Sequence, residues 1–298
     1  MPDESYDFTP QNQLMQADEI EALAKIFVNQ GVQKIRLTGG EPLIRKDAED
    51  IIDRLARLPV KLAITSNGIR IHDFIHQFER IGLTSVNISL DTLDREKFAL
   101  LTKRDYFDKV YDNIQLLLSR QFHVKINMVV IKNINDNEIM SFVEWTKDIP
   151  IHIRFIEFMP FSGNKWQHEK VFSWQEILER VSDHYPIMPL EREKHDTVKK
   201  YRIDGYAGTF AVISTMSAPF CSDCNRMRLT ADGKMKNCLF SQGETDLLTP
   251  FRQGKDILPL ITGNILEKAS ELGGQFKAEI GNVDISAIQN RSMITIGG

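Results

Sequence analysis

The sequence predicts an α/β fold in which a parallel β-sheet curves into an open, incomplete β/α barrel. Apolar segments of strand type alternate with segments of helical periodicity from residue 18 to residue 158. Glycine or proline ends several of the helical segments. Such alternation is typical of a parallel sheet with helices packed outside it, and five or six units are too few for a closed eight-stranded barrel.

The individual elements follow from local periodicity. Ile20, Leu23 and Phe27 recur at helical spacing after Asp18, and Gly31 ends that helix. The same reasoning gives an alternating series after it. The predicted strands are residues 34–38, 61–66, 85–90, 123–130 and 152–158, and the predicted helices between them are residues 47–58, 71–81, 107–120 and 137–146.

The carboxyl ends of these strands are the predicted ligand-binding edge, as in other open parallel sheets. Beyond Met159-Pro160 the alternation stops, and we expect one helix over residues 173–183 followed by short extended segments at 201–203 and 209–213. We therefore divide the chain into a barrel domain, residues 1–160, and a C-terminal α+β region, residues 161–298. The edge candidates are Gly39 to Glu41, Ser66 to Gly68, Asp91 and Met159.

Composition excludes several classes of function. The net charge is −4, from 37 basic and 41 acidic residues, which does not favour bulk binding to nucleic acid. No apolar run approaches the roughly 18 residues that a membrane span needs. The first residues are polar and acidic and resemble neither a signal nor a transit peptide. We expect a cytoplasmic protein that contacts neither membrane nor nucleic acid.

The three cysteines, Cys221, Cys224 and Cys238, lie in one short segment, CSDCNRMRLTADGKMKNCLF. An odd number argues against a disulfide framework and favours a metal site. Asp232-Gly233 predicts a two-residue hairpin turn, which would pair Ala231 with Lys234 and Met227 with Cys238. The three sulfurs would then meet at the open end of the hairpin.

Two kinds of metal site are compatible with this spacing. Structural zinc usually takes four protein ligands, and the nearest histidine in sequence is His195. An iron–sulfur cluster with three thiolates and one open iron is the alternative. Spacing alone does not separate them. Arg226 and Arg228 share one face beside the cysteines, which suits an anionic ligand at the open position.

The motifs, taken in order, resemble one family. They are IRLTGGEPLIRKD, TSNG, NISLDTLD, RFIEFMP, FCSDCNRMRLTADGKMKNCLF and the final IGG. They are similar to the GTP 3′,8-cyclases that begin molybdenum-cofactor biosynthesis by radical S-adenosylmethionine (SAM) chemistry, and the resemblance spans the whole chain. It implies a barrel of the radical SAM type, a second 4Fe–4S cluster in the C-terminal region, and conversion of GTP to 3′,8-cyclo-7,8-dihydro-GTP.

The resemblance also implies roles for particular residues, although it leaves the catalytic residues unassigned. Strand-borne Arg and Lys inside a barrel are costly unless paired, so a polyanionic ligand is a physical reason for them. The implied partners are GTP, a flavodoxin-like reductant, a downstream cyclic pyranopterin monophosphate synthase and a second copy of the chain. The implied SAM contacts are Gly40, Ser89 and Met159, the implied GTP contacts are Arg36, Thr65, Lys125, Arg226 and Arg228, and the implied cluster ligands are Cys221, Cys224 and Cys238.

The sequence departs from the family at its beginning. The family's CxxxCxxC motif, which holds the SAM-cleaving 4Fe–4S cluster, would precede Met1-Pro2 and is missing. A misplaced start site is the favoured explanation, and the chain as written is then expected to be inactive. A non-catalytic paralogue that binds GTP or an iron–sulfur cluster is the alternative, and a zinc-stabilised interaction domain is a third class. The resemblance further implies that Gly297-Gly298 reaches the active site.

Overall fold

The computed structural model describes residues 9–162, 164, 166–192, 194–275 and 291–293. Its centre is an eight-stranded sheet of order β1-β2-β3-β4-β5-β8-β7-β6. The strands are β1 (Lys34–Leu37), β2 (Lys61–Ser66), β3 (Ser85–Ser89), β4 (His123–Val130), β5 (His152–Glu157), β6 (Ile187–Pro189), β7 (Lys199–Ile203) and β8 (Thr209–Ile213).

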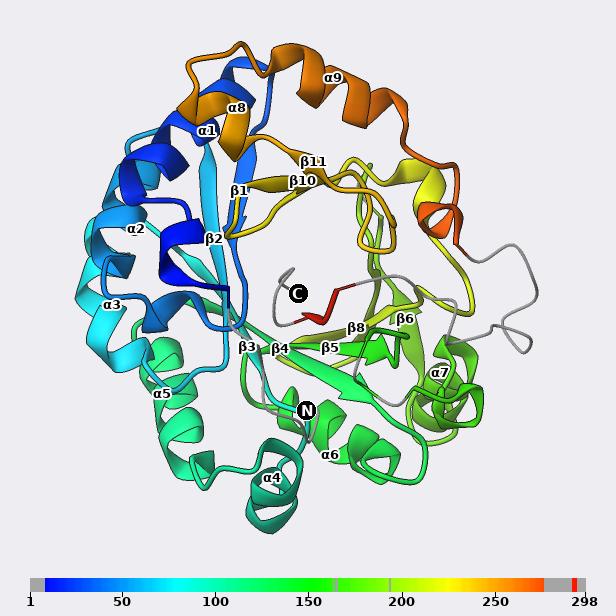
Figure 1. Cartoon of the computed structure of the whole chain (residues 1–298). Helices are drawn as coiled ribbons and strands as arrows, with labels where there is room; N and C mark the ends of the chain where they lie inside the picture. The colour runs from blue at the N-terminus through cyan, green and yellow to red at the C-terminus, as the bar shows by residue number, and fades with distance from the viewer. Residues whose placement is uncertain (1–8, 163, 165, 193, 276–290, 294–298) are drawn as a thin grey trace.

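The sheet is curved and has helices on its outer side (Figure 1). β1 to β5 and β8 run parallel, whereas β7 and β6 continue the sheet antiparallel. The prediction of an open α/β barrel is therefore confirmed. The helices are α1 (Ala17–Asn29), α2 (Ala48–Ala56), α3 (Ile71–Arg80), α4 (Arg95–Thr102), α5 (Phe107–Ser119), α6 (Ile139–Trp145), α7 (Trp174–Ser182), α8 (Leu248–Arg252) and α9 (Leu258–Leu266).

Within the large sheet and its helices, α4 and β6 were not predicted from the sequence. α4 is short, and the carboxylate of its N-cap residue Asp94 accepts a hydrogen bond from the Lys97 amide. β6 has only three residues and is recognised as a strand by its pairing with β7. The sheet also crosses residue 160, because β8 pairs with β5. The division into two domains stays a prediction.

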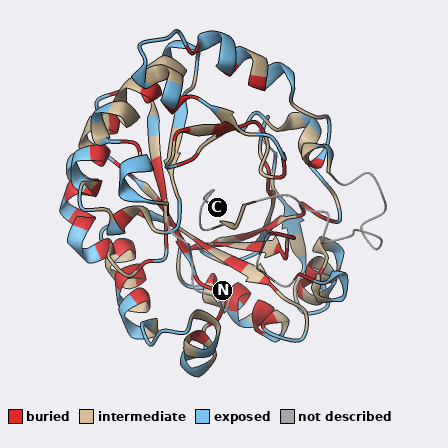
Figure 2. Cartoon of the chain, in the orientation of Figure 1, coloured by how far each residue is buried: buried red, intermediate tan, exposed pale blue. Residues whose placement is uncertain are grey.

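The outer face of the sheet is the main apolar core. Along β4, Val124, Ile126 and Met128 are buried, and they alternate with half-buried residues that point to the inner face. Figure 2 shows the buried residues on the strands and on the inward sides of the helices. Each Å² of apolar surface buried stabilises the fold by roughly 25 cal/mol. This layer therefore gives rigid support to the side chains on the inner face.

A second, three-stranded sheet holds the cysteine segment. It consists of β9 (Arg228–Leu229), β10 (Lys234–Lys236) and β11 (Thr245–Asp246), all antiparallel. The predicted hairpin register is wrong by one residue. Leu229 pairs with Met235, and the Thr230 amide bonds to the Lys234 carbonyl, so three residues form the loop. Gly233 has φ +72°, which fits a three-residue loop with a glycine in the left-handed region.

The hairpin packs on helices from both ends of the chain. Met235 is buried together with Leu23 of α1 and Ile261 of α9. Arg252 of α8 forms a two-pronged ion pair with Glu19 of α1, at 2.6 and 2.9 Å. Figure 1 shows the resulting arch of α8, α9 and β9–β11 opposite β5 and β8. None of the described helices is long and apolar enough to span a membrane.

Candidate functional site

The inner face of the sheet is polar where an ordinary barrel is filled with branched apolar residues. One row across the sheet is set by the strand register. Thr65 of β2 lies beside Asn87 of β3, which lies beside Lys125 of β4; Lys125 in turn pairs with His152 of β5, and His152 with Thr209 of β8. His152 Nδ1 is 2.5 Å from Thr209 Oγ1. These polar side chains are not part of the apolar core, so they can contact a polar ligand.

Basic side chains dominate this inner face. The Arg36 guanidinium reaches across to Thr65 Oγ1 and the Ile64 carbonyl, each at 3.4 Å. Among the described residues, Lys34, Lys125 and Arg154 have no ion-pair partner within 4 Å. We call the whole group the cation cluster, and it consists of Lys34, Arg36, Lys125, Arg154, Arg226 and Arg228.

The cation cluster joins the two sheets. Arg226, next to β9, acts electrostatically on Arg36 of β1 and on Arg154 of β5, so the hairpin faces the strands. The Arg226 guanidinium also donates to Thr197 Oγ1. The three predicted GTP-contacting residues of the barrel strands and the two of the hairpin are thus brought to one interior region.

Burial and mutual repulsion lower the pKa values of these cations. Burial, then Arg154, Lys34 and Arg36, lower the pKa of Lys125 to about 8. Burial followed by Arg36 and Arg226 lowers the pKa of Arg154 to about 10, and burial followed by Arg226 does the same for Arg228. Like charges held this close together are stabilised when a polyanion binds among them.

Unpartnered polar atoms mark the same surface. Asn87 Oδ1, Asn127 Oδ1 and Arg154 Nε are buried and have no hydrogen-bond partner among the described residues. Asn127 and Arg154 are paired in register on β4 and β5. Buried donors and acceptors in folded proteins usually have partners, and a polar ligand bound on this face would supply them for these three atoms.

A cavity of about 330 Å³ opens at the amino ends of β3, β4, β5 and β8. Its wall includes Lys125, His123 and His152. Burial, then the charges of Arg154, Lys125 and Lys200, lower the pKa of His152 to about 3, so the imidazole is neutral at pH 7. Three members of the polar row, Lys125, His152 and Thr209, line this cavity at the amino end of the sheet.

The three cysteines lie together beside the cation cluster. Cys221 and Cys238 pack on one apolar cluster with Phe240 and with the predicted SAM contact Met159. Burial, opposed by the Leu272 amide, raises the pKa of the Cys221 thiol, and the thiols of Cys238 and Cys224 raise it further. Among the described residues, no three His, Cys, Asp or Glu side chains converge tightly enough to form a ready-made metal site.

The donor set nevertheless fits an iron–sulfur cluster with three protein ligands. Soft thiolates are the donors that such clusters take, and the described part of the chain offers no fourth cysteine. His195 lies at the same loop, where its Nδ1 donates a hydrogen bond to the Asp223 carbonyl at 2.8 Å, so this nitrogen is already in use. Arg226 and Arg228 lie within electrostatic range of Cys224. An anionic, three-thiolate site with adjacent arginines can hold a cluster with an open position for a ligand.

A segment after α9 closes over the cysteine loop. The Leu272 amide donates to Cys221 Sγ at 3.3 Å, and Lys268 Nζ donates to the Cys224 carbonyl at 2.6 Å. Gly273 has φ +65°, and a Cβ there would lie 2.4 Å from the Phe240 carbonyl carbon. Amide hydrogen bonds to ligand sulfurs are among the features that tune iron–sulfur sites. The sequence analysis missed this segment, since its role depends on contacts far along the chain.

The predicted SAM contacts lie at the carboxyl ends of three strands. Gly40 follows β1, Ser89 ends β3 and Met159 follows β5. The first two edge loops are held together by Glu41, whose carboxylate accepts from Ser66 Oγ at 2.9 Å and from the Asn67 amide at 2.6 Å. These loops lie at the carboxyl edge of the sheet as expected, and their contact with a ligand stays a prediction.

One of the edge candidates also bonds to a neighbouring strand. Asp91 is half-buried, and its carboxylate accepts from the Val129 amide at 2.9 Å. Burial raises its pKa.

Arg154 and Lys34 were missed by the sequence analysis. Both are on strands whose inner-face positions were already known to carry polar residues, such as Arg36 beside Lys34. The argument that a basic residue on a barrel strand needs an anion applies equally to Arg154 in HIRFIEF. Only the apolar character of the flanking residues concealed it.

Comparison with known proteins places the chain in a family. The radical SAM superfamily profile matches residues 4–146, and the profile for molybdenum cofactor synthesis C matches residues 151–272. The chain is 42% identical to the mitochondrial GTP 3′,8-cyclase of Arabidopsis thaliana, over all of this chain and 76% of that protein. It is 39% identical to the GTP 3′,8-cyclase of Thermodesulfovibrio yellowstonii, over 85% of this chain and 80% of that one.

The chain spans about half the length of its animal relatives. It is 39% identical to molybdenum cofactor biosynthesis protein 1 of Homo sapiens, over 99% of this chain and 46% of that protein. Among solved structures, Streptococcus suis SuiB bound to S-adenosylmethionine shares the fold, with TM-score 0.58 and 14% identity over 98% of this chain and 71% of that one. The chain therefore belongs to the GTP 3′,8-cyclase family of molybdenum cofactor biosynthesis, within the radical SAM superfamily.

Proposed function

We propose that this protein binds GTP between the two sheets and converts it to 3′,8-cyclo-7,8-dihydro-GTP. The cation cluster carries the proposal, because basic groups on β1, β4, β5 and the cysteine hairpin point at one interior region. Lys34, Lys125 and Arg154 have no ion-pair partner among the described residues, and a nucleoside triphosphate would supply the opposing negative charge. Relatives with this activity in their names support the assignment.

The side chains of this chain would orient and confine the nucleotide. Lys125, Arg36 and Arg154 would neutralise the triphosphate, and Thr65 would donate to it, while Arg226 and Arg228 would hold the base beside the cysteine cluster. Positioning of this kind supplies much of the barrier reduction in such reactions. When bound, the 4Fe–4S cluster at Cys221, Cys224 and Cys238 would supply an open iron as a Lewis acid for the base. Gly40, Ser89 and Met159 are proposed to contact SAM.

GTP binding tests the proposal most directly. Arg154→Met removes a buried cation and keeps side-chain volume, so we expect GTP affinity to fall by about 1.5–3 kcal/mol, the scale of charge-assisted hydrogen bonds. Arg252→Met is the matched control, since it removes the same charge from an exposed ion pair far from the site. Titration calorimetry on anaerobically reconstituted protein measures both. Equal GTP affinity in the two variants contradicts the proposed site.

Radical formation is a separate part of the proposal. We propose that it requires a CxxxCxxC segment, and all three cysteines of these 298 residues belong to the hairpin segment. With SAM, GTP and a reductant such as a flavodoxin or dithionite, a protein carrying that segment should form 5′-deoxyadenosine. The 298-residue chain should not.

Comparable 5′-deoxyadenosine formation by both proteins contradicts the requirement, whereas formation by neither favours a GTP- or cluster-binding protein without catalysis. A downstream cyclic pyranopterin monophosphate synthase and a homodimer remain proposed partners.

A further inference from the structure

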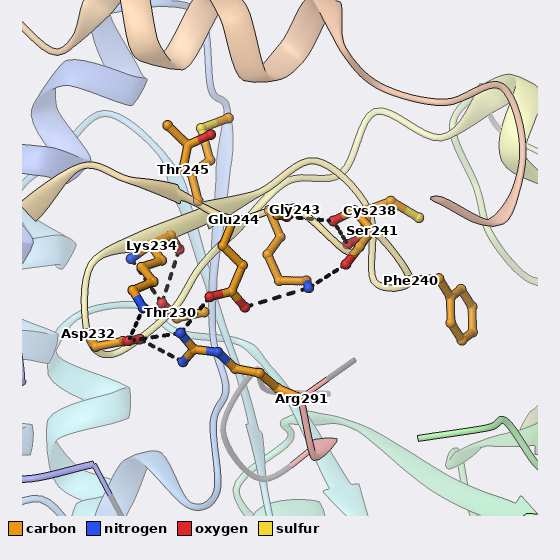
Figure 3. Close-up of polar contacts among 12 residues, drawn as sticks. Thr230, Asp232, Lys234, Cys238, Phe240, Ser241, Gly243, Glu244, Thr245 and Arg291 are labelled. Carbon is orange, nitrogen blue, oxygen red and sulfur yellow. Dashed lines mark hydrogen bonds and ion pairs between the residues drawn. The ribbon is translucent and has the colours of Figure 1, made fainter. Parts of the chain in front are cut away.

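The loop of the cysteine hairpin is joined to a distant piece of the chain. Arg291 forms a bidentate ion pair with Asp232, in which Nη1 donates to Oδ1 and Nη2 donates to Oδ2, each at 3.0 Å. Its Nη2 also donates to Glu244 Oε2 at 2.5 Å. Figure 3 shows the guanidinium between the two carboxylates. One arginine thus ties residues 291–293 to both ends of the small sheet.

The contact continues towards a predicted cluster ligand. Glu244 faces the Lys236 ammonium at 3.6 Å, and Lys236 Nζ donates to the Ser241 carbonyl at 2.6 Å. Ser241 Oγ donates to the Cys238 carbonyl at 3.0 Å. Lys236 is almost wholly buried, with 1% of its side chain exposed, so this chain of contacts is screened from water. These contacts connect Arg291 to the backbone carbonyl of Cys238.

The residues beside Arg291 lie on the apolar side of the same site. Met293 packs on the cluster that contains Phe240 and Met216, together with Cys221, Cys238 and Met159. Figure 1 places residues 291–293 inside the ring formed by the two sheets. The ion pairs of Arg291 hold the same short segment two residues before Met293.

We propose that Arg291 is a positioning residue that pins residues 291–293 to the hairpin loop, so that Met293 completes the apolar wall beside the cysteines. This deepens the proposed function, since the wall excludes water from the nucleotide and preserves the field of the cation cluster. The geometry favours arginine, because its planar guanidinium bonds to both oxygens of Asp232 and also reaches Glu244, whereas a lysine ammonium lacks this fork.

Hydrogen–deuterium exchange tests the anchor without nucleotide. In the reconstituted full chain, Arg291→Ala should raise exchange at residues 291–293 by on the order of tenfold. Arg291→Lys should lie between Arg291→Ala and the parent. Arg252→Ala removes the comparable ion pair to Glu19 and should leave this segment unchanged. Unchanged exchange in Arg291→Ala overturns the proposal.

GTP affinity tests the positioning role. Arg291→Ala should weaken GTP binding by roughly threefold to tenfold, while Arg252→Ala lowers the melting temperature without changing affinity. Asp232→Asn keeps the size of the loop side chain and removes its charge. It should also weaken GTP binding, and the double variant with Arg291→Ala should bind GTP no more weakly than Arg291→Ala alone. Faster exchange with unchanged GTP affinity overturns the positioning role. A parent chain that does not bind GTP overturns the proposed function, and the exchange result then still decides the anchor.

Discussion

The large sheet and the cysteine hairpin support their charged side chains by different means. In the large sheet, cations such as Lys125 and Arg154 stand on long strands backed by an apolar layer of residues with no exposed surface, among them Phe155 and Ile153. In the hairpin, Arg228 stands on β9, a strand of two residues, and Arg226 lies just before it. Ion pairs and backbone contacts from distant segments hold that region, including Arg291 to Asp232 and Gly273 against Phe240.

The difference indicates which half of the site is preformed. Repelling cations need a rigid support, and the apolar core behind β4 and β5 supplies it without any ligand. The hairpin depends on polar contacts and on a metal cluster whose binding energy would add to its folding energy. We therefore expect the barrel half to be ordered in the apo protein and the hairpin half to gain stability when the cluster is assembled.

The largest expected effect is the loss of stability when a buried phenylalanine is removed from the large sheet or from beside the cysteines. Phe155→Ala, in the large sheet, should lower the free energy of unfolding by about 3–5 kcal/mol with or without iron. Phe240, equally buried, packs beside Cys238 and stacks on Phe161 at 5.5 Å. The cost of Phe240→Ala should appear mainly after cluster reconstitution, because the apo hairpin opens locally before the barrel unfolds.

Urea unfolding of apo and reconstituted protein measures both costs. If Phe240→Ala costs as much in the apo protein as Phe155→Ala does, the hairpin is as independently stable as the barrel and the comparison fails.

A pair of glycines sharpens the comparison. Gly273→Ala would place a Cβ 2.4 Å from the Phe240 carbonyl carbon at φ +65°, whereas Gly254→Ala has φ +70° and open space around it. Backbone strain is common to both, at about 1 kcal/mol, and the collision adds about 1–3 kcal/mol for Gly273 alone. Gly273→Ala should also lower iron content after reconstitution. Identical stability and iron content in the two variants would show that the close approach is unimportant.

The smallest expected effect is the pH dependence of nucleotide binding. The pKa of Lys125 is lowered to about 8 in the folded protein, from 10.5, so its charge destabilises the fold below about pH 8 and stability rises as pH increases towards 10.5. GTP binding has the opposite sign, because it requires the ammonium. Affinity should fall by roughly threefold to tenfold between pH 7 and pH 9.5.

Lys125→Arg is the control for this dependence, since arginine stays charged throughout that range. Titration of GTP into both proteins at a series of pH values should give a flatter profile for the variant. The same slope in both would assign the dependence to another group.

Much of the barrel could be predicted because its signals are local. The alternation in HVKINMVV predicts a strand with Val124 and Ile126 on one face and Lys125 on the other, and the structure has that arrangement. Strand starts and helix ends follow from Gly31, Pro59 and Gly82 in the same way. The CxxC-x13-C spacing likewise identifies three neighbouring thiols without any knowledge of the fold.

The sequence by itself determined which residues alternate, which helices cover the sheet and which cysteines lie in one segment, because each depends on neighbours a few residues apart. Only the tertiary structure decided that Arg154 faces Arg226, that the hairpin loop has three residues, and that Asp232 binds Arg291, 59 positions away. Those contacts join segments whose relative placement follows from packing of the two sheets, and no periodicity in the chain encodes such a distance.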